Sequence, residues 1–287
     1  LAAGMTAQAQ NLKLTADNID EIVKAMTLEE KAHLLVGGDN YDDKGNRIDY
    51  VPGAAGPSHA ISRLGIPATV LTDGPAGVRI SSRRKGTDQT FYGTGFPVGI
   101  ALASTWNTEL VEEVGRSIGN EVLEYGCDVL LAPGMNIHRT PLCGRNFEYY
   151  SEDPVVSGKV AARLISGAGD KGTYCAFKHF AMVDQEEERW WIPSVWATEQ
   201  TIRELYLKAF EIAVKGAVKT IRYTSDDQGT VSAKTMRACD CMMGSGWSGI
   251  GGLFSAYDYN LMTGVLRKEW GFKGFVITDY DQGNAPY

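Results

Sequence analysis

The chain has 287 residues, of which 44% are hydrophobic and 22% are charged, a composition typical of globular proteins. Its formal net charge of −7 argues against nucleic acid or an anionic membrane as the main partner, because both require a basic surface. No apolar run reaches the roughly 18–20 residues that a membrane-spanning helix needs, so we expect no such helix.

The N-terminal residues 1–20 are expected to form a tail, and residues 21–287 to form one domain. Within the tail, Ala7-Gln8-Ala9 fits the small-residue pattern that precedes a secretory cleavage site. This pattern slightly favours a secreted or periplasmic protein over an unstructured terminus of no special role. Further on, Thr27-Leu-Glu-Glu30 predicts a capping box that opens a helix, and the glycine- and proline-rich residues 37–65 predict loop.

From residue 67 onward, short apolar runs alternate with segments of helical periodicity. Strands are predicted at 67–73, 127–133, 174–181 and 274–279, and a further apolar run lies at 96–105. Helices are predicted at 107–126, 154–169, 197–216 and 260–271. Because the strands are continuous apolar runs separated by amphipathic helices, they indicate an α/β fold with a parallel sheet buried on both faces.

Polar residues stand at the carboxyl ends of these strands. Asp73 ends the first strand, Lys178 and His179 interrupt the strand at 174–181, and Asp279 ends the last. Each of these residues also has a simpler explanation when it is considered alone. Asp73 could be a turn residue, the Lys178-His179 pair could mark a strand that enters solvent, and Asp279 could cap a helix. Together they favour a pocket, because the carboxyl ends of parallel strands meet on one face of an α/β barrel.

The chemistry of these side chains suits a polyhydroxylated ligand, which needs hydrogen-bond donors and acceptors in one place. Arg145 is a further candidate, although a structural ion pair with Glu148 or Asp153 is the alternative. The six Trp and 13 Tyr residues also fit, since aromatic faces pack against the C–H surface of a sugar.

No metal or cofactor is predicted. The five cysteines are scattered, and Cys239-Asp-Cys241 is too tight for a zinc pair and has no second pair, so we expect structural or free thiols. The glycine pattern at 244–249 has the G-x-G-x-x-G spacing of a dinucleotide site. It is not followed by a predicted helix, which argues against that function.

Six motifs together resemble the catalytic barrel of family 3 glycoside hydrolases, the β-glucosidase group, in order and spacing over roughly residues 20–284. They are "LTDGPAGVR" (71–79), "FPVGIALASTWN" (96–107), "LLAPGMNIHRTPLCGRNFEYYSEDP" (130–154), "KHFAMVDQEEER" (178–189), "IRELYLKAFEIAVK" (202–215) and "LRKEWGFKGFVITDY" (266–280). The resemblance implies a (β/α)8 barrel of the triosephosphate isomerase (TIM) type. We expect this barrel to be incomplete at its C-terminal side, where the chain stops before the last segment.

The resemblance also implies a retaining β-glycosidase that needs no metal or cofactor. Asp279 would be the nucleophile, kept ionised by nearby cations. The residues implied to bind the sugar hydroxyls are Asp73, Arg145, Lys178 and His179, with Arg189 as a further candidate. The general acid in this family is a Glu of a second, α/β sandwich domain, so we expect that domain, or another chain, as a partner.

Two departures from the family pattern concern specificity. Val183 stands where the family usually has Asn, and residues 241–260 differ from the usual pocket-lining segment. The sequence "MVDQEEER" after the Lys-His-Phe motif argues against N-acetylglucosaminide hydrolysis. A β-glucosidase is therefore expected, with a β-xylosidase as one alternative and a sugar-binding barrel without catalysis as another.

Overall fold

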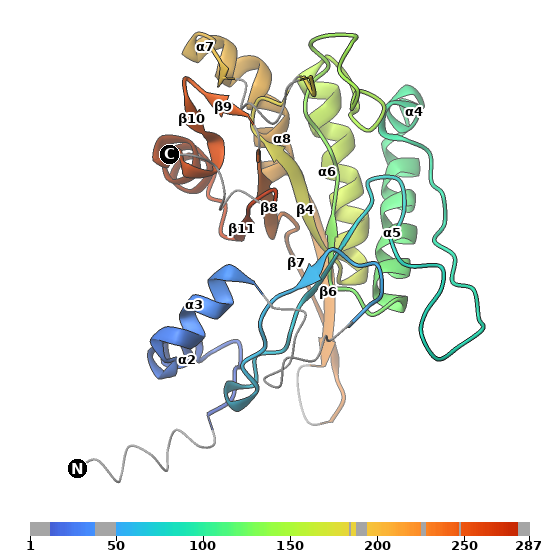
Figure 1. Ribbon diagram of the computed structural model, residues 1–287, viewed down its shortest axis with the longest axis vertical. Coiled ribbons are helices and arrows are strands. Elements are labelled where there is room, and N and C mark those ends of the chain that lie inside the picture. Colours follow the sequence, from blue (N-terminus) through green and yellow to red (C-terminus); the bar gives the residue numbers. More distant parts are fainter. Residues whose placement is uncertain are drawn as a thin grey trace.

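The computed structural model describes residues 12–37, 50–183, 185–187, 194–224, 228–246 and 248–280. These residues form a central sheet with helices packed against its outer face (Figure 1). No helix of the described ranges is both long and apolar enough to cross a bilayer. Ala7, Ala9 and the rest of the N-terminal tail up to residue 11 lie outside the described residues.

The central sheet has the strand order β1-β2-β3-β4-β8-β11. Its strands are β1 (Gly56–Pro57), β2 (Val70–Asp73), β3 (Val129–Leu131), β4 (Tyr174–Phe180), β8 (Cys241–Gly244) and β11 (Phe275–Ile277). Within this sheet, the neighbouring strands β2, β3, β4, β8 and β11 pair in parallel. Only β1 is antiparallel to its neighbour, β2. A smaller three-stranded sheet joins β5 (Ser194–Val195), β9 (Gly249–Ile250) and β10 (Leu253–Phe254).

The central strands are buried on both faces, as their apolar runs predict. In β4 and β8, Cys175, Phe177 and Met242 pack in the cluster shared with the helices. The alternate residues Ala176 and Cys241 pack in a second cluster on the opposite face of the sheet. The order of strands and helices around this curled sheet confirms the predicted α/β fold of the (β/α)8 barrel type. The described residues contribute five parallel strands to this barrel.

Helices α5 (Thr108–Glu124) and α6 (Pro154–Lys171) agree with the predicted ones. Asn107 caps α5, while α6 begins at Pro154, is capped by Asp153 and ends at Gly172 in the left-handed conformation. Near the N-terminus, α2 (Ile19–Ala25) precedes α3 (Leu28–Val36), which opens with the predicted capping box. The short 3-10 helix η1 (Ser62–Leu64) and the strand β1 interrupt the predicted loop.

The helix predicted at 197–216 is present, with an unpredicted π-helical segment. It consists of α7 (Glu199–Thr201), the π-helix η3 (Ile202–Tyr206) and α8 (Lys208–Gly216). The helix predicted at 260–271 is the π-helix η5 (Asn260–Glu269), preceded by the 3-10 helix η4 (Ser255–Tyr257). The apolar run at 96–105 contains a short helix, α4 (Gly99–Ser104).

Glycines allow α5 and α6 to pack at close range. A Cβ added at Gly167 would lie 2.0 Å from the carbonyl oxygen of Glu112, and one at Gly115 would lie 2.4 Å from that of Leu164. Because these are backbone atoms, a side chain would push the helices apart. We expect Gly167→Ala to lower the free energy of unfolding by about 2 kcal/mol, measured by urea denaturation.

The matched control for this substitution is Gly264→Ala in η5, where an added Cβ meets no atom within 4 Å. It is expected to leave the free energy of unfolding unchanged or to raise it by up to about 1 kcal/mol. Equal losses in the two variants would contradict the close-packing explanation.

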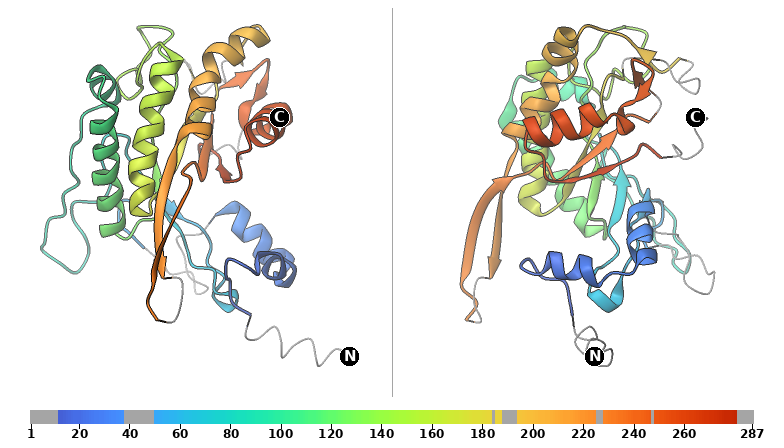
Figure 2. Two further views of the ribbon diagram at one scale, coloured as in Figure 1. Left: turned by 180° about the vertical axis from the view of Figure 1, so that it is seen from behind. Right: turned by 90° about the vertical axis from the view of Figure 1, so that its left-hand side faces the viewer.

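One hairpin stands apart from the rest of the fold. Strands β6 (Val218–Thr224) and β7 (Val231–Arg237) form a two-stranded antiparallel sheet of their own. Both views in Figure 2 show this hairpin extending beyond the sheet and helices. No element is predicted here from the sequence, so the hairpin is an addition to the predicted fold.

Candidate active site

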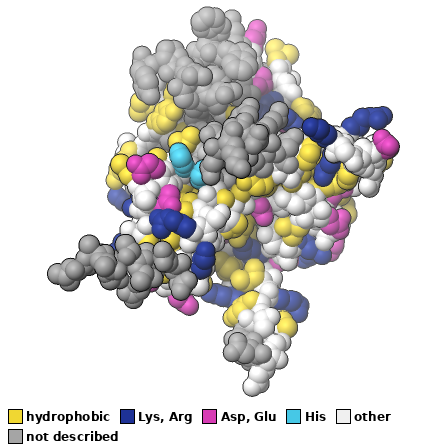
Figure 3. All heavy atoms as spheres, turned by 60° about the horizontal axis from the view of Figure 1, so that its bottom comes forward, with side chains coloured by type: hydrophobic (Ala, Val, Ile, Leu, Met, Phe, Trp, Pro, Cys, Tyr) yellow, Lys and Arg dark blue, Asp and Glu magenta, His cyan; other side chains and the backbone are white. Residues whose placement is uncertain are grey.

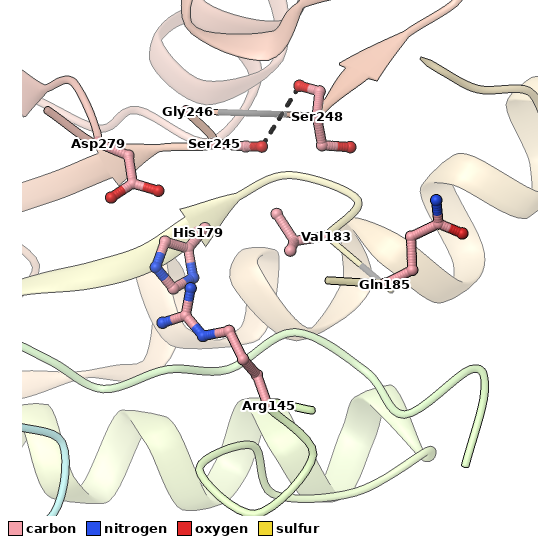
Figure 4. A pocket seen from close by; sticks show the side chains of 8 residues that line it. All are labelled: Arg145, His179, Val183, Gln185, Ser245, Gly246, Ser248 and Asp279. Atoms are coloured by element: carbon pink, nitrogen blue, oxygen red, sulfur yellow. Dashed lines mark hydrogen bonds between the residues drawn. The ribbon is translucent and has the colours of Figure 1, made fainter. Parts of the chain in front are cut away.

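A pocket lies at the carboxyl ends of the central strands. Figure 4 shows three of the predicted site residues around it: Arg145 from the loop before α6, His179 from β4, and Asp279 two residues after β11. The space between these side chains, counted together with the open solvent at its mouth, is about 210 Å³. Its complete lining in the described residues is Arg145, His179, Val183, Gln185, Ser245, Gly246, Ser248 and Asp279.

Asp73 at the end of β2 and Lys178 in β4 form an ion pair across β3, the strand between them. The Lys178 Nζ lies 2.9 Å from Asp73 Oδ1, which also accepts a hydrogen bond from the backbone N–H of Gly74. The Lys178 side chain is only 5% exposed, so the alternative in which it enters solvent is wrong. Burial by itself raises the pKa of Asp73, but the Lys178 ammonium, together with the Gly74 N–H and Arg79, outweighs burial, and the pKa lies below its ordinary value.

Arg145 is held by two carboxylates and an aromatic ring. Its Nε donates a hydrogen bond to Glu148, and its Nη1 lies 3.8 Å from Glu186. Its guanidinium also lies 5.8 Å from the centre of the Tyr149 ring. Burial acts to lower the pKa of Arg145, but Tyr149, Glu148 and Glu186 raise it well above its ordinary value. Arg145 is therefore both a member of a structural ion pair and part of the pocket wall.

His179 is fixed by hydrogen bonds on both its backbone and its ring. Its backbone N–H donates to Asn136 Oδ1 at 2.8 Å, and its carbonyl oxygen accepts from Asn136 Nδ2 at 2.9 Å. Its ring Nδ1 lies 3.3 Å from the Tyr149 hydroxyl, within hydrogen-bond distance. His179 is buried, so the alternative interpretation, in which the strand enters solvent at Lys178 and His179, is wrong for His179 as it is for Lys178. Asn136 and Tyr149 thus hold the site in shape, although neither is among the site residues predicted from the sequence.

The two candidate carboxylates, Asp73 and Asp279, share a neighbour. Burial raises the pKa of the Tyr280 hydroxyl to about 12, and the charges of Asp73 and Asp279 add to this effect. Both carboxylates therefore act on the same phenol at this end of the sheet. Arg79 also reaches this region, with its Nη1 3.6 Å from Asp73 Oδ2.

The segment that departs from the family pattern lines the pocket. Ser245 follows β8, and its hydroxyl donates to the carbonyl oxygen of Ser248 at 3.3 Å, the dashed line in Figure 4. The Ser248 hydroxyl in turn donates to the Met182 carbonyl oxygen at 2.9 Å, after β4. Val183 presents its apolar side chain to the same pocket. Both regions that the sequence marks as unusual therefore form the pocket wall.

Five of the six predicted site residues lie at this end of the sheet. Arg145, His179 and Asp279 line the pocket, and Asp73 and Lys178 form the adjoining pair. Arg189 lies outside the described residues. In the described part of the chain, no three His, Cys, Asp or Glu side chains are grouped as a metal site would require. All five cysteine thiols are buried.

An α/β barrel domain with carboxylates and cations at the carboxyl ends of its strands is a scaffold typical of enzymes. Comparison with known proteins identifies the family to which this scaffold belongs. The model of the glycosyl hydrolase family 3 N-terminal domain matches residues 6–284. The chain therefore belongs to glycoside hydrolase family 3.

Several relatives in this family are similar over nearly the whole chain. Thermostable beta-glucosidase B of Acetivibrio thermocellus is 35% identical over 94% of this chain, and an exo-alpha-(1->6)-L-arabinopyranosidase of Bifidobacterium breve is 36% identical over 90%. The structure of beta-glucosidase 3B from Thermotoga neapolitana in complex with glucose has a TM-score of 0.80 at 46% identity and covers 92% of this chain.

These relatives are much longer than this chain. The alignment covers 31% of the A. thermocellus protein, 30% of the B. breve protein and 34% of the T. neapolitana chain. The chain thus spans about a third of the length of the relatives it matches.

Proposed function

We propose that this chain is the nucleophile-bearing barrel of a retaining β-glycosidase of the β-glucosidase type, which removes terminal non-reducing β-linked glucosyl residues. The observation that carries the proposal is the position of Asp279. Its carboxylate follows a parallel strand and lines the same pocket as Arg145 and His179. That position suits a rigidly held nucleophile directed at a bound sugar.

In the proposed reaction, the Asp279 carboxylate attacks the anomeric carbon while the bond to the leaving-group oxygen breaks. The covalent glycosyl ester that forms is then hydrolysed by water, which restores the carboxylate and releases the sugar. Arg145 and His179 would bind sugar hydroxyls from the pocket wall. The Asp73–Lys178 pair supplies both an acceptor and a donor for adjacent hydroxyls.

The general acid is proposed to come from a second domain or another chain. Glu148 and Glu186 are the carboxylates next to Arg145, and both are engaged with its guanidinium. We therefore assign neither as the acid. The greater length of the relatives leaves room for a domain that supplies this group.

A mechanism-based label tests the proposal without requiring the acid. A 2-deoxy-2-fluoro glucoside with a dinitrophenyl leaving group should add one fluoroglucosyl unit to the peptide that contains Asp279, detected by mass spectrometry. Labelling elsewhere would contradict the assignment of the nucleophile. No labelling, with glucose binding retained, would instead favour a sugar-binding barrel without catalysis.

The sugar specificity is proposed from the relatives, which include beta-glucosidases and an arabinopyranosidase. A β-xylosidase is the main alternative, because the proposed hydroxyl-binding residues suit either pyranose. Labelling rates with the 2-fluoro glucoside and the matching 2-fluoro xyloside distinguish the two. A faster reaction with the glucoside supports the glucosidase, whereas a faster reaction with the xyloside overturns it.

A further inference from the structure

The β6–β7 hairpin lies at the end of the sheet opposite the pocket. Its base contacts the amino end of β4, where Lys219 Nζ lies 4.9 Å from the centre of the Tyr174 ring. The pocket residues lie instead at or beyond the carboxyl ends of β3, β4, β8 and β11. The hairpin therefore takes no part in the proposed catalytic site.

The base of the hairpin is firmly attached, whereas its strands are exposed. Lys219 is buried and forms an ion pair with Asp240, and Arg237 Nη1 donates to the Val214 carbonyl oxygen at 2.9 Å. Along the strands, all residues but Lys219, Ile221 and Ser232 are exposed. The hairpin is thus a structured projection with most of its surface in solvent.

The direction of the backbone groups follows from two hydrogen bonds at the base. The N–H of Val218 donates to Ser166 Oγ and that of Thr220 to Asp170 Oδ1, both on α6 and away from β7. Because successive residues of an antiparallel pair alternate in direction, the even-numbered residues of β6 direct their N–H and C=O outward. The residues of β7 opposite Thr220 and Arg222 are Thr235 and Ala233.

Thr235 and Ala233 therefore direct their backbone groups to the outer edge of β7. The hydroxyls of Thr220 and Thr235 lie 3.0 Å apart, which supports this orientation. Side chains approach most closely at the pairs of an antiparallel ladder whose backbones are not hydrogen-bonded to each other. The outer edge of β6 meets α6 at its base, but β7 has no neighbour other than β6 among the described strands. An exposed strand edge of this kind is a template for one more strand.

The strands are also basic, in contrast to the rest of the chain. The strands contain the cations Lys219, Arg222, Lys234 and Arg237 and no Asp or Glu, and the sequence between the strands contains Asp226 and Asp227. The hairpin therefore keeps an excess of positive charge, whereas the whole chain has a net charge of −7. Lys219 is neutralised by Asp240, which leaves three exposed cations. Figure 3 shows this projection at the lower edge of the view, with Lys, Arg and hydrophobic side chains along it.

We propose that the outer edge of β7 binds an acidic polypeptide segment in extended conformation, which adds as a third strand. The open edge supplies backbone donors and acceptors, and Arg222, Lys234 and Arg237 attract carboxylates. Exposed apolar side chains, among them Val231 at 66% exposure, provide contact area for alternate residues of the partner. Two copies of this hairpin are poor partners for each other, because the same cations would face one another.

Charge reversal tests the electrostatic part of the proposal. The probe is a fluorescein-labelled peptide of alternating Glu and Val, titrated with the protein and followed by fluorescence anisotropy at low salt. The double variant Arg222→Glu/Lys234→Glu is expected to bind it at least about 10-fold more weakly, and added salt should weaken wild-type binding. The matched control is Arg83→Glu/Lys85→Glu in an exposed loop, which should bind as the wild type does.

A proline substitution tests the backbone part. Ala233→Pro removes one outward N–H without changing charge, and proline is tolerated on the outer side of an edge strand. It should weaken binding of the Glu-Val peptide, while circular dichroism and labelling of Asp279 remain as in the wild type. Binding that survives Ala233→Pro but not charge reversal would overturn strand addition.

Four further results would overturn the proposal. One is failure of the wild-type protein to bind the Glu-Val peptide. Another is equal binding of the matching Lys-Val peptide. The third is preferential binding to dextran sulfate or to phosphatidylglycerol vesicles, which offer charge without a strand. The last is self-association through the hairpin, which sedimentation would detect as a dimer lost in Ala233→Pro.

Discussion

Asp279→Asn is expected to lower the rate of glycoside cleavage by roughly four orders of magnitude, because an amide cannot attack the anomeric carbon as a carboxylate does. The substitution changes one oxygen to nitrogen at a residue that lines the pocket beyond the end of β11, so the fold should be retained. The measurement is the release of dinitrophenol from 2,4-dinitrophenyl β-glucoside, a leaving group that needs no general acid.

The matched control for this variant is Asp88→Asn, which changes an exposed carboxylate in the loop before α4. It should cleave the same substrate at the wild-type rate. A second variant, Asp279→Ala, leaves space for a small anion, and added azide should restore part of the rate and give the α-glucosyl azide. A substantial rate in Asp279→Asn, or formation of the β-azide, would show that another group attacks the sugar.

The residues at the strand ends can be predicted from the sequence because of a simple regularity. Continuous apolar runs predict parallel strands, and parallel strands bring their carboxyl ends to one face of the sheet. The order of residues alone therefore places Asp73, Lys178 and Asp279 at the same end of the sheet. The fold class is predictable for the same reason, since the alternation of strand and helix is local in the sequence.

Contacts between distant segments are not predictable in this way. The pairing of Asn136 with the backbone of His179 joins residues 43 positions apart, and no local pattern encodes it. Likewise, Ser248 reaches the Met182 carbonyl across 66 positions. These hydrogen bonds depend on how the loops after neighbouring strands meet, which only the folded chain determines.

The β6–β7 hairpin is not among the elements predicted from the sequence, although its sequence carries a signal. "VKTIRYT" contains four β-branched residues in seven, and Gly229 precedes the second strand. In a chain dominated by parallel strands and helices, the expected element after α8 is a buried strand of the sheet. The exposed hairpin is inserted before that buried strand, which is β8.

Lys178→Met is expected to cost about 2 kcal/mol of the free energy of unfolding at neutral pH, because it removes the main partner of the half-buried Asp73 carboxylate, whose side chain is 33% exposed. Methionine keeps a long flexible side chain in the space of the lysine, so loss of packing is small. Arg79 remains near Asp73, but its side chain is 70% exposed and compensates only weakly. Urea denaturation measures the loss.

The loss should depend on pH in a definite direction. Burial raises the pKa of Asp73 in the folded protein, but Lys178, aided by the Gly74 N–H and Arg79, holds this pKa below its ordinary value. The stabilisation is therefore complete above the ordinary pKa of an aspartate and disappears as the pH falls through the lowered, folded-state pKa. The difference in stability between wild type and Lys178→Met should accordingly narrow in acid.

A control and a double variant separate the ion pair from other effects of the substitution. Lys171→Met removes an exposed ammonium at the end of α6 and should change stability by no more than about 0.5 kcal/mol. Asp73→Asn/Lys178→Met should lose less than the two single variants combined, because no charge is left buried without a partner. Two results would mean that Lys178 stabilises the barrel by packing rather than through Asp73. One is that the losses in the free energy of unfolding of the two single variants add up in the double variant. The other is that the difference in stability between wild type and Lys178→Met stays constant in acid.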